Sequence, residues 1–319
     1  MIRRPPRSTQ GVSSAASDVY KRQVRKSSLM SEKELPWERM SIETLEREYS
    51  PSSCVTNYEE LVHSYTSESN KISKILKFEK DLIYGISREE KLDLCLAEAD
   101  DSPLVIFIHG GYWQLLSKDD CLFPAKDFVD TGISYCSIDY TLAPRAHINE
   151  MIEQCIRAVR WLYQSASNYG YDEKKFFLIG SSAGAHLAAM TILADWKNYD
   201  LPADIIKGCT LLSGVYDIRP IVKTYINEPL NLDMQTASML SPLFKVKQNP
   251  ADLIISWGEN ETDEFKRQSI EFEKKWKACG NTSNLMEIKG NNHFDIVFNM
   301  MKKDCALREL IIEQIMRVS

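Results

Sequence analysis

The stretch Phe176-Phe177-Leu178-Ile179-Gly180-Ser181-Ser182-Ala183-Gly184 decides the fold of this chain. Its four leading apolar residues are typical of a buried strand, and residues 185–196 continue as a helix-like segment. A Gly-x-Ser-x-Gly pentapeptide between a strand and a helix is typical of a nucleophile elbow, a sharp turn that exposes its central serine. Glycines are needed there because a Cβ would clash where strand and helix meet. The sequence therefore predicts Ser182 as a nucleophile.

A second glycine-rich segment, His109-Gly110-Gly111-Tyr112-Trp113, follows the apolar run 104–108. In proteins with such an elbow, a loop of this kind supplies backbone N–H groups to an oxyanion hole, together with the residue after the nucleophile. We therefore expect the N–H groups of Gly110, Gly111 and Ala183 to bind a developing oxyanion.

Short apolar runs alternate with helical patterns along the rest of the chain. This alternation predicts an α/β fold, with a mostly parallel central sheet and helices on both faces. Alternating residues at 74–96 predict two antiparallel strands ahead of it, and the irregular stretch 216–250 is a candidate lid or specificity insertion. The apolar runs are 105–108, 133–138, 176–179, 209–212 and 253–257, and the helical patterns are 148–167, 264–278 and 302–316.

The first 29 residues differ in composition from the remainder. They carry several arginines and lysines but a single acidic residue, Asp18, although the whole chain has a net charge of −6. They lack the apolar segment of a secretory signal and resemble translated sequencing-adapter sequence. We expect residues 1–29 to be a non-native, disordered leader, Met30 to be the natural start with Met40 as a second possibility, and residues 30–319 to form one domain.

Composition also excludes several classes of function. The acidic body argues against a nucleic-acid partner. No apolar run approaches the roughly 20 residues of a membrane-spanning helix, so we expect a soluble protein with no membrane partner. The eight cysteines are scattered without the spacing of a zinc site, which predicts free thiols in a reducing compartment and no bound metal.

A serine nucleophile needs a base, and the base needs a carboxylate that orients it. In the fold that carries this elbow, the chain order is serine, acid, histidine. That order selects His293, in the segment Gly290-Asn291-Asn292-His293-Phe294 after an apolar strand. We expect structural roles for the other four histidines, His63, His109, His147 and His186.

The acid is less sharply defined by the residues. It should follow the strand at 253–257, where Glu259, Glu261, Asp263 and Glu264 are candidates. Asp263 is also predicted as the N-cap of the next helix. Asp217, after the strand at 209–212, is an alternative acid.

The motifs taken together resemble those of the kynurenine formamidase (arylformamidase) family, with an α/β-hydrolase fold. The resemblance runs from about Pro36 to the C-terminal helix, and its most specific element is His-Gly-Gly-x-Trp, where related esterases and lipases usually carry a third glycine. The matching segments are Pro36-Trp37, Met40-Ser41, His109 to Gln114, Gly184 to Ala188, Ala194 to Trp196, Leu212 to Asp217 and Asn292 to Asp295.

The resemblance implies hydrolysis of the small molecule N-formyl-L-kynurenine to L-kynurenine and formate, in the cytosol, without a cofactor, and often as a homodimer. A broad carboxylesterase is the alternative. Aligning Gly258 and the segment from Phe265 to Ser269 places Glu261 at the family's acid position, where other members commonly have Asp. Tyr112 and Trp113 are then candidate substrate-binding residues, which would narrow the acyl side or face the substrate's ring.

Overall fold

The computed structural model describes residues 36–300 and 302–318. Contacts divide the chain after Met40: the short 3-10 helix η1 (Pro36–Arg39) precedes the division, and Ser41–Ser319 form one compact unit. The predicted leader at 1–29 and the predicted domain start at residue 30 lie outside the described residues. Among the described residues, the sheet and the α-helices belong to the unit that begins at Ser41.

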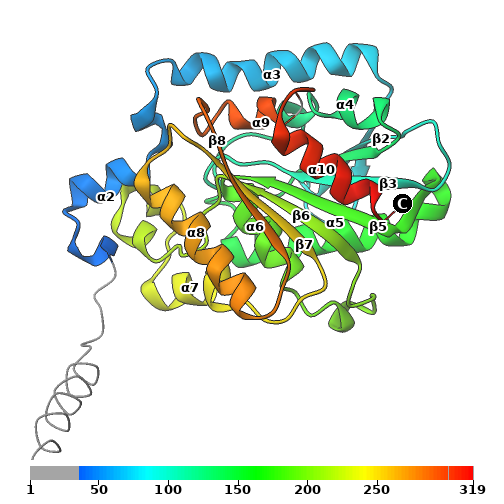
Figure 1. Ribbon diagram of the computed structural model, residues 1–319. Coiled ribbons are helices and arrows are strands. Elements are labelled where there is room, and N and C mark those ends of the chain that lie inside the picture. The colour runs from blue at the N-terminus through cyan, green and yellow to red at the C-terminus, as the bar shows by residue number, and fades with distance from the viewer. Residues whose placement is uncertain (1–35, 301, 319) are drawn as a thin grey trace, which may run out of the picture. The chain divides into compact units, whose positions relative to one another are not determined.

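An eight-stranded sheet forms the centre of this unit (Figure 1). The strand order is β1-β2-β4-β3-β5-β6-β7-β8. β2 pairs antiparallel with β1 and β4, and every other pairing is parallel, which confirms the predicted α/β fold and its leading antiparallel strands. The strands are β1 (Glu79–Ile83), β2 (Lys91–Cys95), β3 (Ser102–Ile108), β4 (Ser134–Ile138), β5 (Tyr171–Ser181), β6 (Ile206–Leu212), β7 (Asp252–Gly258) and β8 (Ser283–Ile288).

Burial explains the sequence of the central strands. Every residue of β3 is buried, because helices exclude water from both faces of a parallel sheet. Such a strand therefore reads as a continuous apolar run. The edge strand β1 instead begins Glu79-Lys80-Asp81, and charges at an edge oppose pairing with another sheet.

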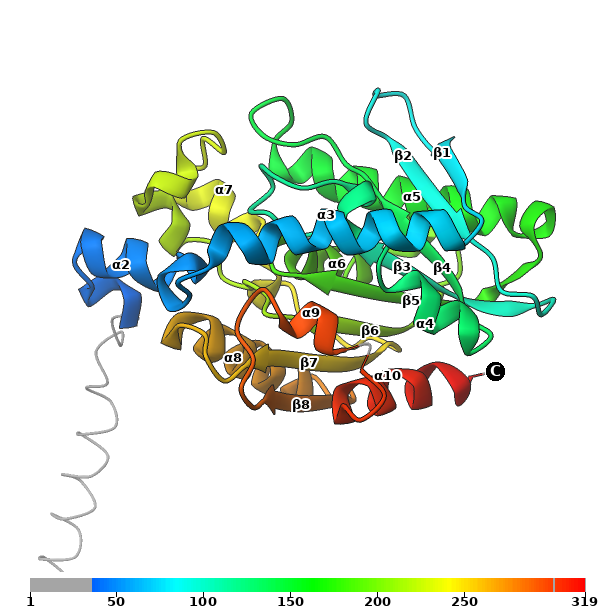
Figure 2. The same cartoon turned by 90° about the horizontal axis from the view of Figure 1, so that it is seen from above.

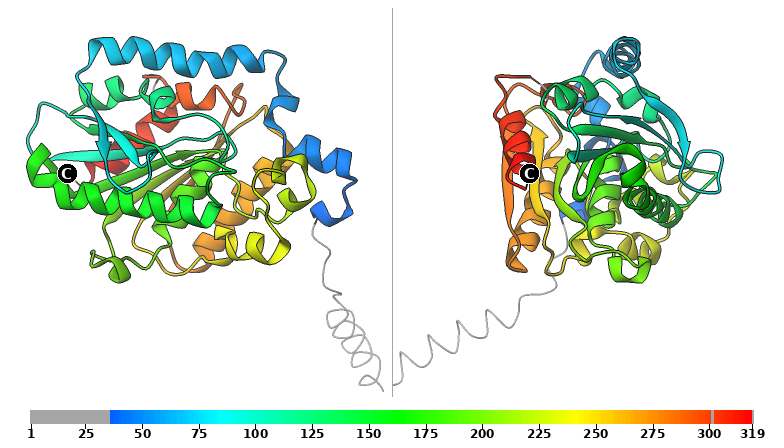
Figure 3. Two further views of the ribbon diagram at one scale, coloured as in Figure 1. Left: turned by 180° about the vertical axis from the view of Figure 1, so that it is seen from behind. Right: turned by 90° about the vertical axis from the view of Figure 1, so that its right-hand side faces the viewer.

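Helices cover both faces of the sheet (Figures 1 and 2). On one face α3, α4, α9 and α10 enclose a core cluster that includes Tyr65, Phe128 and Ile311. On the other face α5 and α6 pack on β5, and α8 packs on β7; Figure 3 shows these layers from behind and from the side. The helices are α2 (Ile42–Glu48), α3 (Tyr58–Ile75), α4 (Ala125–Asp130), α5 (Ile148–Tyr169), α6 (Ala183–Ile192), α7 (Met234–Met239), α8 (Asp263–Ala278), α9 (Ile296–Asn299) and α10 (Ala306–Met316).

The structure corrects two predicted helix starts. The helical pattern at 302–316 forms a helix from Ala306 onward, and residues 303–304 form a turn ahead of it. Asp263 was predicted as an N-cap, but Thr262 holds that position with extended backbone, and Asp263 is the first helical residue of α8. An acidic side chain is still favourable there because it faces the positive end of the helix dipole.

The predicted insertion at 216–250 follows β6 and contains α7 and short 3-10 helices, η5 (Pro220–Lys223), η6 (Tyr225–Asn227) and η7 (Pro242–Phe244). In parallel sheets the loops beyond the carboxyl ends of strands gather at one edge. The loops after β3, β5, β7 and β8 carry the candidate residues, so the topology brings them together.

Candidate active site

Ser182 lies at a sharp turn between the end of β5 and the start of α6. Its backbone is strained, with φ 56° and ψ −119°, a conformation that costs a non-glycine residue about 1–3 kcal/mol. The flanking glycines make the turn possible. A Cβ on Gly180 would lie 2.3 Å from the Gly184 carbonyl oxygen, and one on Gly184 would lie 2.0 Å from the Ile108 oxygen.

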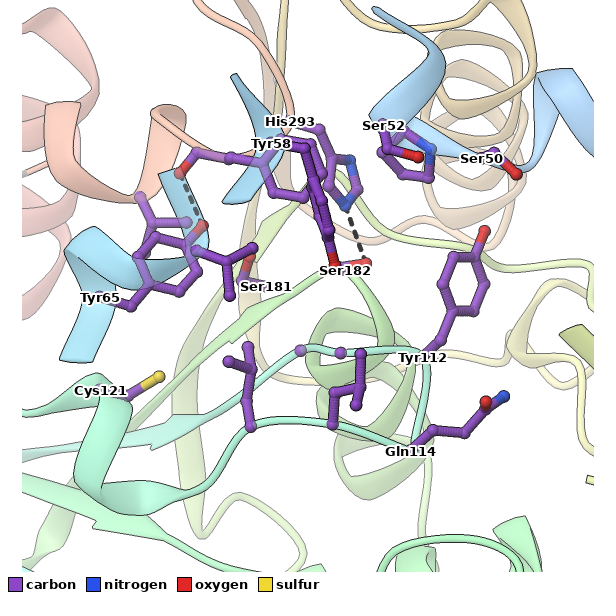
Figure 4. A pocket seen from close by; sticks show the side chains of 18 of the residues that line it. Ser50, Ser52, Tyr58, Tyr65, Tyr112, Gln114, Cys121, Ser181, Ser182 and His293 are labelled. Atoms are coloured by element: carbon purple, nitrogen blue, oxygen red, sulfur yellow. Dashed lines mark hydrogen bonds between the residues drawn. The ribbon is translucent and has the colours of Figure 1, made fainter. Parts of the chain in front are cut away.

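His293 lies in the connection between β8 and α9, with its imidazole directed at Ser182 (Figure 4). The distance between His293 Nε2 and Ser182 Oγ is 2.9 Å, which is hydrogen-bonding distance. Both residues are buried, at 5% and 7% exposure. The imidazole is therefore placed to accept the serine proton.

Glu261 completes a hydrogen-bonded chain from the loop after β7. Its Oε2 lies 2.8 Å from His293 Nδ1. Its Oε1 accepts hydrogen bonds from Ser213 Oγ and from the Gly258 N–H, both at 2.6 Å. The carboxylate is thus held from the side opposite the imidazole. With Nδ1–H donating to Glu261, Nε2 of His293 remains an acceptor for the serine hydroxyl.

The other candidate acids lie elsewhere. Both carboxylate oxygens of Asp217 are bound by Arg219, at 2.9 and 2.7 Å. Asp263 is exposed at the start of α8. The structure therefore brings Glu261, and neither of these two residues, to His293.

The remaining histidines do not contact Ser182 Oγ. His63 and His147 are exposed. Burial lowers the pKa of His109 and of His186 to about 4, so both are neutral at physiological pH. His186 Nε2 donates to the Leu240 carbonyl at 2.8 Å, which is a structural role as expected.

The loop after β3 presents its glycines to the elbow. A Cβ on Gly110 would lie 2.8 Å from the Ser181 oxygen and 3.2 Å from Ser182 Cβ, so only glycine fits this approach. Gly111 has φ +94°, a left-handed conformation that favours glycine. Neither glycine N–H donates a hydrogen bond to another residue that the structure describes. The Ala183 N–H begins α6 and has no partner within the helix.

Comparison with known proteins places this geometry in a family. The chain is 34% identical over 292 residues to the kynurenine formamidase of Danio rerio, covering 88% of this chain and 98% of that protein. It is 32% identical to the kynurenine formamidase of Salmo salar, covering 87% and 97%. The chain belongs to the kynurenine formamidase family.

Two further comparisons concern the fold of this kynurenine formamidase family member. The BD-FAE family profile matches residues 92–276. A solved structure of a Silicibacter protein superimposes with a TM-score of 0.74 at 23% identity, covering 85% of this chain and 98% of that one. That likeness concerns the fold alone, and the fold is that of the α/β hydrolases.

A cavity of about 360 Å³ opens above Ser182 in this family member. Figure 4 shows Tyr65 and Cys121 on one side of Ser182, and Ser50, Tyr112 and Gln114 on the other. No Lys, Arg, Asp or Glu is among the described residues that line it. Burial raises the pKa of the Tyr65, Tyr112 and Cys121 side chains well above their ordinary values, so these three groups stay uncharged.

The two aromatic residues of the oxyanion loop point in different directions. Tyr112 lines the cavity, and its hydroxyl donates to the Tyr49 carbonyl oxygen. Trp113 was predicted to bind substrate, but this prediction is wrong. Its side chain is fully buried and packs edge-on against His186, with ring centroids 5.0 Å apart, so it supports the loop from the core.

Two residues without a predicted role also contact the site. Ser213 holds the second oxygen of Glu261. Tyr65, on α3, donates to the carbonyl of the residue after His293. Ser213 belongs to a segment that matches the family, which was the available signal. Tyr65 is a single tyrosine on a polar helix, and no sequence motif marks it.

Among residues 36–300 and 302–318, no three or more His, Cys, Asp or Glu side chains are grouped so that they could hold a metal ion. No helix in this part of the chain is long and apolar enough to span a membrane.

Proposed function

We propose that this chain is an arylformamidase that hydrolyses the formyl amide of N-formyl-L-kynurenine to L-kynurenine and formate. The observation that carries the proposal is the continuous hydrogen-bonded chain Ser182–His293–Glu261, facing an oxyanion loop in a kynurenine formamidase family member. This arrangement supplies a nucleophile, a base and an orienting carboxylate, as acyl transfer requires.

Acylation begins when Ser182 Oγ attacks the formyl carbon while His293 Nε2 takes its proton. The carbonyl electron pair moves to oxygen, and the N–H groups of Gly110, Gly111 and Ala183 bind that oxyanion. Glu261 stabilises the imidazolium. The imidazolium then protonates the aniline nitrogen as the C–N bond breaks, which releases L-kynurenine and leaves formyl-Ser182.

Deacylation reverses these roles. His293 takes a proton from water as the water oxygen attacks the formyl carbon. The oxyanion forms in the same hole, the C–O bond to Ser182 breaks, and the imidazolium returns a proton to Oγ. Formic acid leaves and loses its proton to water to give formate, and the enzyme is restored.

Steady-state kinetics on N-formyl-L-kynurenine, followed by the appearance of L-kynurenine, test the proposal. We expect saturable turnover in the wild type. An enzyme that hydrolyses a short-chain aryl ester but leaves N-formyl-L-kynurenine intact would contradict it.

One observation favours a second candidate, a broad carboxylesterase. N-formyl-L-kynurenine carries an ammonium and a carboxylate, while the cavity wall offers no opposite charge to either among its described residues. Desolvating an unpaired charge is costly, so these groups must stay at the open mouth of the cavity in water. A kcat/KM for a neutral aryl ester above that for N-formyl-L-kynurenine would favour the esterase.

We also propose that the enzyme works in the cytosol and as a homodimer. The location is supported by the eight cysteines, all of which are free thiols, as a reducing compartment would keep them. The dimer is a proposal from the family resemblance. Light scattering coupled to gel filtration would measure the mass, and a monomeric mass at assay concentrations would contradict the dimer.

A further inference from the structure

The seven-residue connection 289–295, which carries His293, is supported on one side by the loop of the acid. The Asn260 N–H donates to the Asn291 carbonyl at 2.7 Å, and the Gly290 N–H donates to Glu259 Oε2 at 2.8 Å. These bonds tie the residues before His293 to the loop that contains Glu261. Within the connection, Asn292 Oδ1 accepts hydrogen bonds from the N–H groups of Phe294 and Asp295, at 2.8 and 3.1 Å, and these local bonds do not involve the Phe294 carbonyl oxygen.

The second support comes from α3, which is far away in the sequence. Tyr65 Oη donates a 2.6 Å hydrogen bond to the carbonyl oxygen of Phe294, the residue directly after His293 (Figure 4). This oxygen accepts no other hydrogen bond from the described residues. Tyr65 is 7% exposed, and burial raises its pKa, so its hydroxyl stays protonated and remains a donor.

Tyr65 is itself fixed in place. Its ring stacks on Phe123 at 5.7 Å between centroids and packs against Phe298 at 5.1 Å. One turn further along α3, Ser69 Oγ accepts hydrogen bonds from the N–H groups of Leu122 and Phe123, at 3.0 and 3.2 Å. The helix is thus bound to the core of the sheet, and the hydroxyl of Tyr65 has a defined position.

We propose that Tyr65 is a positioning residue for His293. Its hydrogen bond fixes the backbone after the histidine, so that the imidazole keeps both its 2.9 Å contact with Ser182 and its 2.8 Å contact with Glu261. The inference rests on the proposed function, because it assumes turnover through Ser182 and His293, but it applies to any substrate that the pair hydrolyses. A misplacement of 1 Å in a catalytic group can cost about 100-fold in rate.

Tyr65→Phe tests this role because it keeps the ring and its stacking and removes only the donor. We expect kcat to fall by about tenfold, less than a full 1 Å misplacement would cost, because the acid loop still holds the other side. KM should stay within about twofold, since an interaction that orients the base acts on the chemical step rather than on ground-state binding. The same loss should occur with N-formyl-L-kynurenine and with an aryl ester.

A spectroscopic measurement separates positioning from general loss of stability. The proton that His293 Nδ1 shares with Glu261 should give a low-field NMR resonance in the wild type, and Tyr65→Phe should shift or broaden it. The matched control is Tyr171→Phe, which also removes a buried hydroxyl that donates to a backbone carbonyl, that of Leu162 at 2.7 Å, but at a position that does not line the cavity. We expect it to lower the Tm by a similar amount and to leave kcat and the resonance unchanged.

Three results would overturn the inference: an unchanged kcat in Tyr65→Phe, a rise in KM at constant kcat, which would mean direct substrate contact, or an equal loss of kcat in Tyr171→Phe. Failure of the proposed function gives a different result. In that case the wild type hydrolyses only the ester, and the comparison of variants proceeds on that substrate.

Discussion

Replacing Glu261 with Gln should lower kcat by about 10⁴, and the structure gives the reason. One carboxylate oxygen accepts from both Ser213 and the Gly258 N–H, while the other accepts from His293. An amide has one accepting oxygen. If that oxygen keeps the two bonds from Ser213 and Gly258, the NH₂ group faces His293 Nδ1 and forces the wrong imidazole tautomer, which cannot accept the serine proton.

A factor of 10⁴ corresponds to about 5.5 kcal/mol of transition-state stabilisation. The fold should lose less, about 2 kcal/mol, because a charge-assisted hydrogen bond becomes a neutral one. Initial rates on N-formyl-L-kynurenine and urea denaturation measure the two losses separately. Asp263→Asn is the control: its exposed side chain makes no contact with His293, so kcat should stay within about twofold. If Glu261→Gln retains more than about a tenth of the wild-type kcat, Glu261 is not the orienting acid.

Three other predictions follow from the same geometry. Ser182→Ala should reduce kcat by about 10⁴ or more, whereas Ser181→Ala should have a mild effect; equal losses would mean that the elbow has been misread. If Tyr112 narrows the acyl side, the formyl amide of an aryl amine should be hydrolysed at least about tenfold faster than its acetyl amide, and faster acetyl turnover would contradict this role. Burial lowers the pKa of His186 to about 4, against about 6.5 in the unfolded chain, so the unfolded state binds the extra proton and stability falls as pH drops through this window. Between pH 7 and pH 5 this group should cost about 2 kcal/mol in urea denaturation, and His186→Gln should remove that part of the pH dependence; an equal slope in both proteins would refute it.

Hydrophobic periodicity and the context of the Gly-x-Ser-x-Gly motif were enough to predict the fold. Strand β3 and the buried part of β5, residues 176–181, read as apolar runs because both of their faces lose water, and the elbow at Ser182 identified the strand-to-helix turn. The start of α10 was less predictable. Residues 302–305 have no breaker that separates them from the following helical pattern, so local sequence could not place its start at Ala306.

The elbow motif selected Ser182, and chain order was then enough to select His293, because only His186 and His293 follow the elbow in the sequence. It was not enough to select the acid, since four carboxylates follow β7 within a few residues. The choice depends on which of them faces inward. The Gly258 N–H and the Ser213 hydroxyl together favour an inward carboxylate at Glu261, and this pair of donors forms only when the loops after β6 and β7 meet.

The error at Trp113 has a related cause. Gly111, Tyr112 and Trp113 have successive positive φ values of 94°, 51° and 60°, so the loop has neither the period of a helix nor that of a strand. Alternation along the sequence therefore says nothing about which aromatic ring enters the cavity. The ring that enters is that of Tyr112, whose hydroxyl donates to the carbonyl of Tyr49, in the segment between α2 and α3. Tyr225, from the insertion after β6, lines the same cavity. The reacting groups come from the loops after the sheet strands, whereas part of the cavity wall comes from the segment between α2 and α3 and from the insertion after β6. Substitutions in these two segments should therefore change substrate preference and leave the Ser182–His293–Glu261 geometry intact.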